Sequence, residues 1–306
     1  MRIHPRVIEQ TNACLKTGCT GAEELLSPEA VSIMICVGMI TVLAVGDIQL
    51  AIQSCQDERD CVVAERDAFQ TFQTRIKRVE PVKLEPDKIT EPLGTQSCGI
   101  EPTTSPGDAT LRYVLTAYEN SVRSLSHYKS GYDETLAESL AAGLGEDIVT
   151  SLVTNTVLTP PTQQTLIERA QNAIDVRTAL VDAISTEISA LVDRQETLCT
   201  LETKRENLRA HLDSVHACRK DAAFDVWCGL YELETELDKI AQQRQATLAN
   251  SPMKEATSAS SAVEEVNLYE YLYEESDAPR YPVLSAVGML GARISADRNE
   301  VSSHFG

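Results

Sequence analysis

The feature that most constrains this chain is a long run of apolar residues spaced alternately three and four positions apart. The run begins at Leu166 and extends over about seven heptads, with polar interruptions at Arg177, Arg194 and Arg205. This spacing places apolar side chains along one stripe of an α-helix, as in coiled coils. It predicts a helix over residues 162–217, about 80 Å long at roughly 1.5 Å per residue.

A second, shorter stripe with the same spacing follows from Trp227 to Leu248. Only a short polar break around Lys220 and Asp221 separates the two stripes. Two antiparallel helices joined by a short loop can bury both stripes against each other. We therefore expect an antiparallel coiled-coil hairpin over residues 162–249.

The rest of the chain also has helical patterns. Five prolines and no periodicity mark residues 81–107 as a Pro-rich linker. Helices are predicted on both sides of the linker and hairpin, in the segments 53–80, 108–125, 134–143, 145–153, 262–275 and 281–302. No convincing strand alternation is present. The predicted fold class is all-α, with an elongated helical bundle domain over residues 108–302 that contains the hairpin.

The two helices of the hairpin differ in length, so part of the longer apolar stripe needs another cover. The predicted helices within 108–153 and the two C-terminal helices supply further amphipathic faces. We therefore expect an intramolecular bundle, and a homodimer is the alternative. The expected oligomeric state is monomer or homodimer.

Near the N-terminus, residues 30–46 read AVSIMICVGMITVLAVG and carry no charge. A run of this length is the lower limit for crossing about 30 Å of hydrocarbon, and an interfacial Asp47 would extend it. We predict a transmembrane helix over residues 30–52, preceded by a tail over 1–29 and followed by a juxtamembrane amphipathic helix over 53–80. The alternatives are a buried or interfacial helix and a mis-assigned start codon, since Met34 and Met39 lie inside the run.

The basic residues near this segment give a weak orientation. Lys16 precedes it, and Arg59 and Arg66 follow it. Cytoplasmic flanks of membrane spans usually carry more positive charge than the opposite flanks. The C-terminal flank has one basic residue more, so we expect the long C-terminal body in the cytoplasm. The predicted location is the cell membrane, with a single pass.

The formal net charge is −19, from 46 acidic and 27 basic residues spread along the chain. Such a chain is not expected to bind nucleic acid, because phosphate binding depends on lysine and arginine. A dispersed acidic surface with only nine lysines suits a cytoplasm of molar salt, where charges are screened within about 3 Å. An ordinary acidic protein is the other interpretation of this composition.

No motif in the sequence carries recognisable chemistry. The nine cysteines form no C-x-x-C pair, so we expect no structural metal. Gly143 and Gly145 follow no strand and precede no lysine, so we interpret them as loop glycines and not as a phosphate loop. We expect no catalytic residues, no cofactor and no enzymatic activity.

One polar and aromatic cluster is a candidate interaction surface. Its members are Tyr118, His127, Tyr128, Tyr132 and Glu134. The alternative is that these rings pack a corner between helices, each with an apolar body and a polar tip.

Three stretches resemble an uncharacterised family of haloarchaeal proteins, a domain of unknown function that is all-helical. They are Val63-Ala64-Glu65-Arg66-Asp67-Ala68-Phe69 with Arg75 and Val79, Tyr118 to Leu144 with Leu158-Thr159-Pro160, and Tyr271-Leu272-Tyr273 with Arg280-Tyr281-Pro282-Val283-Leu284. The resemblance covers roughly residues 55–302. It implies a haloarchaeal origin and no known activity, so it assigns no functional residue.

These observations favour a membrane-anchored helical scaffold or interaction protein whose protein partner is unknown. The alternative is a soluble helical regulator or sensor that binds a small ligand or a protein partner.

Overall fold

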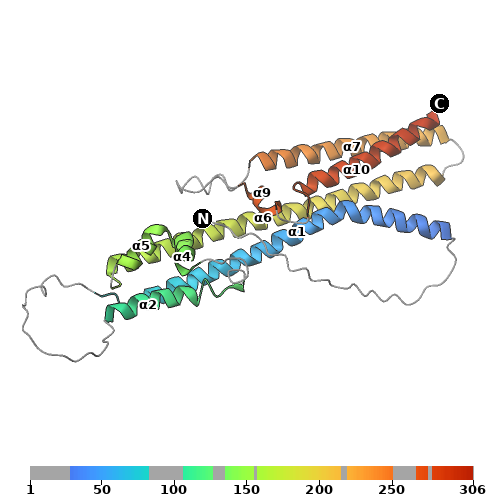
Figure 1. The fold of residues 1–306 in the computed structure, drawn as a ribbon. Helices are drawn as coiled ribbons and strands as arrows, with labels where there is room; N and C mark the ends of the chain where they lie inside the picture. Colours follow the sequence, from blue (N-terminus) through green and yellow to red (C-terminus); the bar gives the residue numbers. More distant parts are fainter. Residues whose placement is uncertain are drawn as a thin grey trace, which may run out of the picture. The chain divides into compact units, whose positions relative to one another are not determined.

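The computed structural model describes residues 28–82, 106–126, 135–154, 157–214, 219–250, 267–274 and 278–305, and in the first of these segments it describes side chains from Gly46 onward. Every regular element in these residues is a helix, which confirms the all-α prediction. The helices are α1 (Pro28–Lys77), α2 (Pro106–Glu119), α4 (Leu136–Leu144), α5 (Glu146–Thr154), α6 (Pro160–Ser214), α7 (Arg219–Ala249), α9 (Leu268–Tyr273) and α10 (Pro282–Ser302), and the 3-10 turn η2 (Ser303–Phe305) follows (Figure 1).

The chain divides into two compact units. Within the described residues, unit 1 comprises 60–182 and unit 2 comprises 28–59 together with 183–305. The long helices α1 and α6 each contribute a segment to both units.

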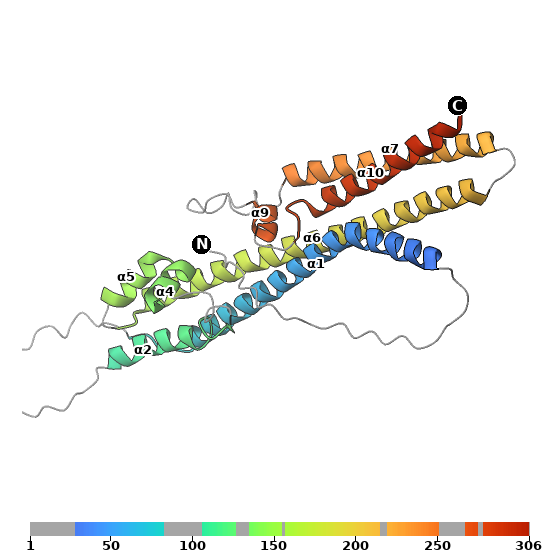
Figure 2. The ribbon, with the colours of Figure 1, turned by 45° about the vertical axis from the view of Figure 1, so that its right-hand side comes forward.

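Unit 2 contains the predicted hairpin, in which α7 runs antiparallel to α6. Glu187 of α6 pairs with Arg244 of α7, and further along α6 the side chain of Leu208 packs closely against Gly229. Moving along α6 from residue 187 to residue 208, the contacted residue of α7 changes from 244 back to 229. The two helices are therefore antiparallel, as Figure 2 also shows. The bounds of α6 and α7 lie within a few residues of those expected from the sequence.

The apolar stripes of these helices form the buried interior of unit 2. Most apolar side chains at the predicted seam positions of α6 and α7 are buried, but Trp227, where the α7 stripe was predicted to begin, is partly exposed. The buried ones include Ile184, Leu191, Leu198 and Leu201 on α6 and Leu230, Leu233 and Leu237 on α7, and Val226 of α7 and Val283, Leu290 and Ile294 of α10 are buried as well. The 3- to 4-residue spacing therefore predicts most of the packing faces.

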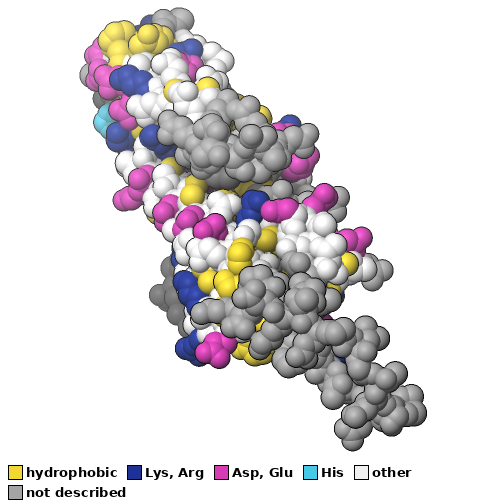
Figure 3. Space-filling model, turned by 90° about the vertical axis from the view of Figure 1, so that its left-hand side faces the viewer, with side chains coloured by type: hydrophobic (Ala, Val, Ile, Leu, Met, Phe, Trp, Pro, Cys, Tyr) yellow, Lys and Arg dark blue, Asp and Glu magenta, His cyan; other side chains and the backbone are white. Residues whose placement is uncertain are grey.

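The surface has a mixed charge pattern. On the face drawn in Figure 3, acidic and basic side chains are interspersed, with hydrophobic side chains between them. This arrangement agrees with acidic residues that are dispersed along the sequence and not gathered in one tail.

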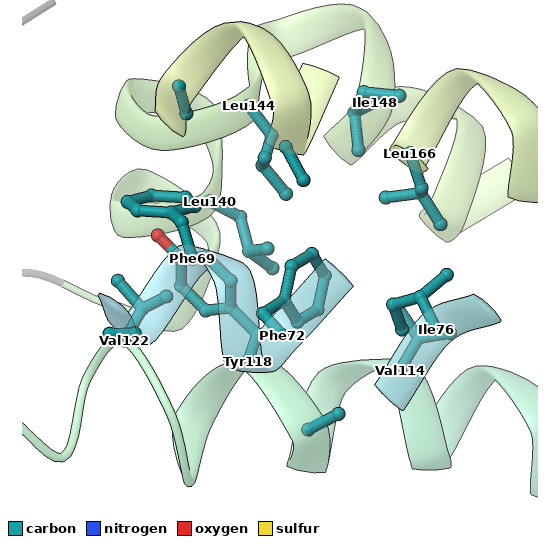
Figure 4. Packing of buried hydrophobic residues seen from close by; sticks show 14 of the residues in the cluster. Phe69, Phe72, Ile76, Val114, Tyr118, Val122, Leu140, Leu144, Ile148 and Leu166 are labelled. Atoms are coloured by element: carbon teal, nitrogen blue, oxygen red, sulfur yellow. The ribbon is translucent and has the colours of Figure 1, made fainter. Parts of the chain in front are cut away.

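Unit 1 has its own core, formed by α1, α2, α4, α5 and α6 (Figure 4). The fully buried side chains of Phe69, Phe72 and Ile76 come from α1 and face Val114 and Tyr118 of α2. The start of α6 is tied to the end of α1, because the Gln163 amide donates to the carbonyl oxygens of Ile76 (2.9 Å) and Val79 (2.7 Å).

The predicted amphipathic helix over 53–80 continues directly from the predicted span, because α1 is one helix from Pro28 to Lys77. The last part of the predicted span is packed inside unit 2. Ile48, Ala51 and Ile52 are buried, and Asp47 accepts a hydrogen bond from Ser285 of α10 at 3.2 Å. Residues 47–52 therefore belong to the helical body.

Among the residues whose side chains are described, no helix combines the length and apolar content needed to cross a bilayer. The apolar residues 30–45 of the predicted span lie outside the part of α1 whose side chains are described. Their membrane insertion stays a prediction.

Candidate functional site

The most distinctive polar groups of this protein are arginines that lie in the seams between helices. Arg177, Arg205 and Arg244 are each less than 9% exposed. Each forms an ion pair with a carboxylate on another helix. A buried charge is tolerated in a protein interior when it is paired and hydrogen-bonded.

In unit 2, Glu187 is the centre of the most deeply buried of these clusters. Its carboxylate receives two hydrogen bonds from the Arg244 guanidinium, from Nη1 at 2.9 Å and from Nη2 at 2.5 Å. The Tyr273 hydroxyl donates to the same carboxylate at 2.6 Å. Both oxygens of Glu187 are thereby satisfied within the bundle, in the two-pronged geometry that arginine favours.

The short helix α9 brings aromatic groups to this cluster. The Tyr269 ring lies under the Arg244 guanidinium, 5.1 Å from ring centroid to the central guanidinium carbon. The Cys55 thiol of α1 lies 3.8 Å from the Tyr273 hydroxyl, to which it donates a weak hydrogen bond. Tyr271 donates to Glu58 of α1. Three tyrosines of one short helix thus contact charged groups of α1, α6 and α7.

The pKa values of two tyrosines and the arginine in this cluster are raised. Burial, followed by the neighbouring Glu187 carboxylate, raises the pKa of the Tyr273 hydroxyl far above its ordinary value. Burial is also the first cause of the raised pKa of Tyr269. Burial lowers the pKa of Arg244, but the hydrogen bonds and the charge of Glu187 outweigh it, so that this pKa is raised as well. The two hydroxyls and the guanidinium therefore hold their protons more tightly than the same groups in water.

A second cluster in unit 2 ties α6 to α10. Arg205 donates to Asp297 at 2.5 Å and to Glu202 at 2.8 and 3.0 Å. Arg209 donates to the other oxygen of Asp297, and Arg293 donates to Glu202 at 3.0 Å. Arginines and carboxylates alternate here, so that each carboxylate has more than one positive neighbour.

In unit 1 the corresponding contact joins α6 to α1. Arg177 Nε donates to Glu65 at 2.8 Å, and the guanidinium lies 4.3 Å from the centroid of the Phe69 ring. Its Nη1 donates to the carbonyl oxygen of Ala173 at 3.2 Å. The polar interruption at residue 177 is therefore a buried, fully packed arginine.

The predicted interaction surface is only partly within the described residues. Tyr118 has no exposed surface, and its ring makes edge-to-face contacts with Phe69 and Phe72 at centroid distances of 6.3 and 5.4 Å. Its hydroxyl donates to the carbonyl oxygen of Ser139 at 2.9 Å. Tyr118 is thus a core residue of unit 1 (Figure 4) and offers no exposed surface to a partner.

The other members of that predicted surface, His127, Tyr128, Tyr132 and Glu134, lie outside the described residues. Their role as a surface stays a prediction. Sequence reasoning also missed the partners of the buried arginines, because Glu65, Glu187 and Asp297 look like ordinary helix-surface acids in the sequence. The 3- to 4-residue spacing places either Glu187 or Ile188 at a seam position, so Glu187 is the only one of these three acids for which the sequence offers a signal.

Within the described residues, no three histidine, cysteine, aspartate or glutamate side chains are placed so that they could hold a metal ion. In this part of the chain Cys55, Cys61, Cys199 and Cys228 are thiols and not disulfides.

A family model described as Domain of unknown function (DUF7260) matches residues 46–298. The chain belongs to this family. The DUF7260 match begins at Gly46, close to Ile48, the first fully buried side chain in the described part of α1. It agrees with the resemblance to a family of unknown function and names no activity. No curated protein and no solved structure matches the chain significantly.

Proposed function

We propose that this DUF7260 protein is a membrane-anchored helical scaffold, in which residues 30–46 hold a rigid helical body at a bilayer. The observation that carries the proposal is the continuity of α1, which runs from Pro28 to Lys77 without a break. From Ile48 onward one face of α1, which includes Ala51 and Ile52, is buried in the helical body. The anchor and the body would therefore share one continuous helix, without a loop between them.

The position of the apolar run supports this assignment. The family match begins at Gly46, so the run precedes the matched domain. Seventeen uncharged residues are at the lower limit for crossing a bilayer about 30 Å thick. The packed residues Asp47 and Ile48 would then place the body directly at the membrane surface.

The buried ion pairs support a scaffold role for the body. Clusters such as that of Glu187, Arg244 and Tyr273 fix which helices pack together and in which register. Helices held in a fixed register that carry charged groups of both signs can present surfaces to partner proteins. The partner is unknown, and we propose that the body lies on the cytoplasmic side, as the weak charge asymmetry favours.

Carbonate extraction of membranes from the native host tests the anchor. The full chain should remain in the membrane pellet. Val37→Asp together with Ile40→Asp should release it, because each carboxylate at the middle of a span raises the insertion free energy by roughly 3 kcal/mol. Leu50→Asp is the matched control, since Leu50 is an exposed apolar residue of the body, and this variant should stay in the pellet.

Recovery of the unmodified chain in the carbonate supernatant would overturn the anchor and favour the soluble regulator or sensor. Protease added to intact cells tests the side of the membrane. The proposed orientation predicts that the helical body survives this treatment and is digested only after lysis.

A further inference from the structure

An exposed aromatic stripe runs along α7, away from the ion-pair clusters. Phe224 and Tyr231 are 58% and 54% exposed, and Trp227 between them is partly exposed. The rings of Trp227 and Tyr231 are stacked, with centroids 6.0 Å apart and planes within 5° of parallel. Several large aromatic residues exposed on one helix face are typical of protein interaction sites.

The stripe has the spacing of a coiled-coil seam. Phe224, Cys228, Tyr231 and Thr235 follow one another at intervals of four, three and four residues, and all are at least partly exposed. This is the alternation of a and d positions in a heptad repeat. Because α7 buries a different stripe inside unit 2, which includes Leu230, it carries a second seam that faces outward.

We propose that this seam pairs α7 with α7 of a second copy of the chain, in a parallel two-stranded coiled coil. The flanking charges fit such a partner. In a parallel pair, each g residue faces the e residue five positions further along the other helix. Lys220 would then face Asp225 of the second copy, and Glu234, which also pairs with Arg298, would face Lys239. Both contacts join opposite charges.

An antiparallel pair fits the same charges less well. With Phe224 opposite Tyr231 of the second copy, Lys220 would lie near Glu234, but Asp225 would lie near Glu232, which places like charges together. Asp221 and Asp238 stand at the two ends of the seam. In the parallel pair, each of these aspartates would face the same aspartate of the second copy. The apolar contact is therefore limited to the roughly two heptads between them.

The parallel direction also rests on the proposed membrane anchor. Within unit 2, Gln49 of α1 bonds Gln195 of α6, and further along α1 the Cys55 thiol reaches Glu187 of α6 through the Tyr273 hydroxyl, so α1 is antiparallel to α6 there. Since α7 is antiparallel to α6 as well, α7 runs in the same direction as α1. Two copies anchored in one membrane by α1 would therefore present their α7 helices in parallel. Anchoring would also raise the effective concentration of a short seam.

Oxidative cross-linking of the full chain in native membranes tests the pairing. Cys228 is the central residue of the seam, so the two copies of this thiol would lie within disulfide distance. A chain that retains only Cys228, with Cys55→Ala and the other seven cysteines replaced by serine, should give a covalent dimer. The matched control retains only Cys199, an exposed thiol of α6, and should stay monomeric.

Two cysteine-free chains with new thiols test the direction. In a parallel pair, Tyr231→Cys should cross-link with itself. In an antiparallel pair, it should cross-link only when mixed with chains that carry Phe224→Cys, and that result would overturn the parallel arrangement. Equal cross-linking through Cys199 and Cys228, or none through Cys228, would overturn the dimer.

Replacing eight or nine cysteines could itself disturb folding, so a further test uses variants that keep all native cysteines. Phe224→Glu with Tyr231→Glu should weaken dimerisation at least tenfold, while Leu50→Glu should leave it unchanged. An unaltered dimer in the first variant would contradict the proposal. If the chain is soluble but still cross-links through Cys228, the anchor fails and the dimer stands, with its direction decided by residues 224 and 231.

Discussion

At the scale of single residues, Gly143 lets α4 approach the core of unit 1 closely. It lies within α4 and not in a loop, which corrects the interpretation from the sequence. A Cβ atom at this position would lie 2.8 Å from the Tyr118 hydroxyl oxygen and 3.1 Å from the Phe69 ring. Both of these side chains are fully buried, so neither can move aside easily.

Gly143→Ala should therefore lower the free energy of unfolding by about 1–3 kcal/mol, as overpacking in a close-packed core does. Gly288→Ala is the matched control, because a Cβ on this α10 glycine would meet no atom within 4 Å. That variant should be neutral or stabilising by up to about 1 kcal/mol. Denaturant unfolding followed by circular dichroism measures both, and equal effects would contradict the close approach.

Tyr118 also gives unit 1 a defined sensitivity to alkali. Burial raises the pKa of Tyr118 to about 12, from its ordinary value of 10.0. Between these values the unfolded chain releases the phenolic proton and the folded chain keeps it, so stability should fall as pH rises above about 10. The loss from this residue by pH 12 is on the order of 2–3 kcal/mol.

The measurement is unfolding at a series of pH values from 8 to about 12, with phenolate absorbance as a direct probe of ionisation. Tyr118→Phe should be less stable at neutral pH, because the hydrogen bond to Ser139 is lost. It should also show a shallower alkaline decline. An unchanged decline would assign the sensitivity to other groups, such as Tyr269 and Tyr273 of unit 2, whose pKa values are also raised by burial.

At the scale of helices, the pair between Glu187 and Arg244 joins α6 to α7. Removing one partner leaves a buried charge without compensation, so Glu187→Leu or Arg244→Met alone should destabilise unit 2 by about 3–5 kcal/mol. The double variant should recover most of this loss, because no uncompensated charge remains. A double-mutant cycle on unfolding free energies tests the coupling, and simple additivity of the two losses would contradict it.

The heptad pattern was enough to predict α6 and α7 within a few residues, because apolar spacing directly reports which face of a helix is buried. It also located Arg177 and Arg205 as polar interruptions of the stripe. It did not predict their partners, Glu65 and Asp297, since pairs separated by 112 and 92 residues depend on how helices pack. The sequence alone offered no reason to separate these carboxylates from the many on the surface.

The helix α9 also shows that contacts between distant parts of the chain could not be predicted from the sequence. A helix over residues 262–275 was predicted, and within the described residues only Leu268–Tyr273 is helical. Three of its six residues are tyrosines, and their hydroxyl and ring contacts with Glu58, Glu187 and Arg244 are tertiary. Tyr118 was likewise assigned to a surface because a tyrosine has both a polar tip and an apolar body. Only packing decides which end of the side chain matters.

At the scale of the whole molecule, the dispersed charge of −19 predicts a stability that depends on salt if it is an adaptation to a cytoplasm of molar salt. We predict that the helical body unfolds as KCl falls below about molar, because the screening length grows from about 3 Å at 1 M to about 10 Å at 0.1 M. The buried pairs are screened less than surface charges and would not remove this effect. Helical circular dichroism that is unchanged between about 2 M and 0.1 M KCl would contradict the prediction.

The central claim is that residues 30–46 anchor the protein and that the body beyond them folds without them. The division between the two lies near Gly46, because Ile48, Ala51 and Ile52 are already part of the buried interior of unit 2. A deletion that ends at residue 45 therefore separates anchor from body, whereas one that ends at residue 52 would remove core side chains.

The most direct measurement compares the full chain with a chain lacking residues 1–45, both produced in the native host. The account predicts that the full chain remains in carbonate-washed membranes. The shortened chain should be recovered in the soluble fraction with unchanged helical circular dichroism per residue and a cooperative unfolding transition. A shortened chain that is unfolded, or one that stays in the membrane pellet as the full chain does, would contradict the account.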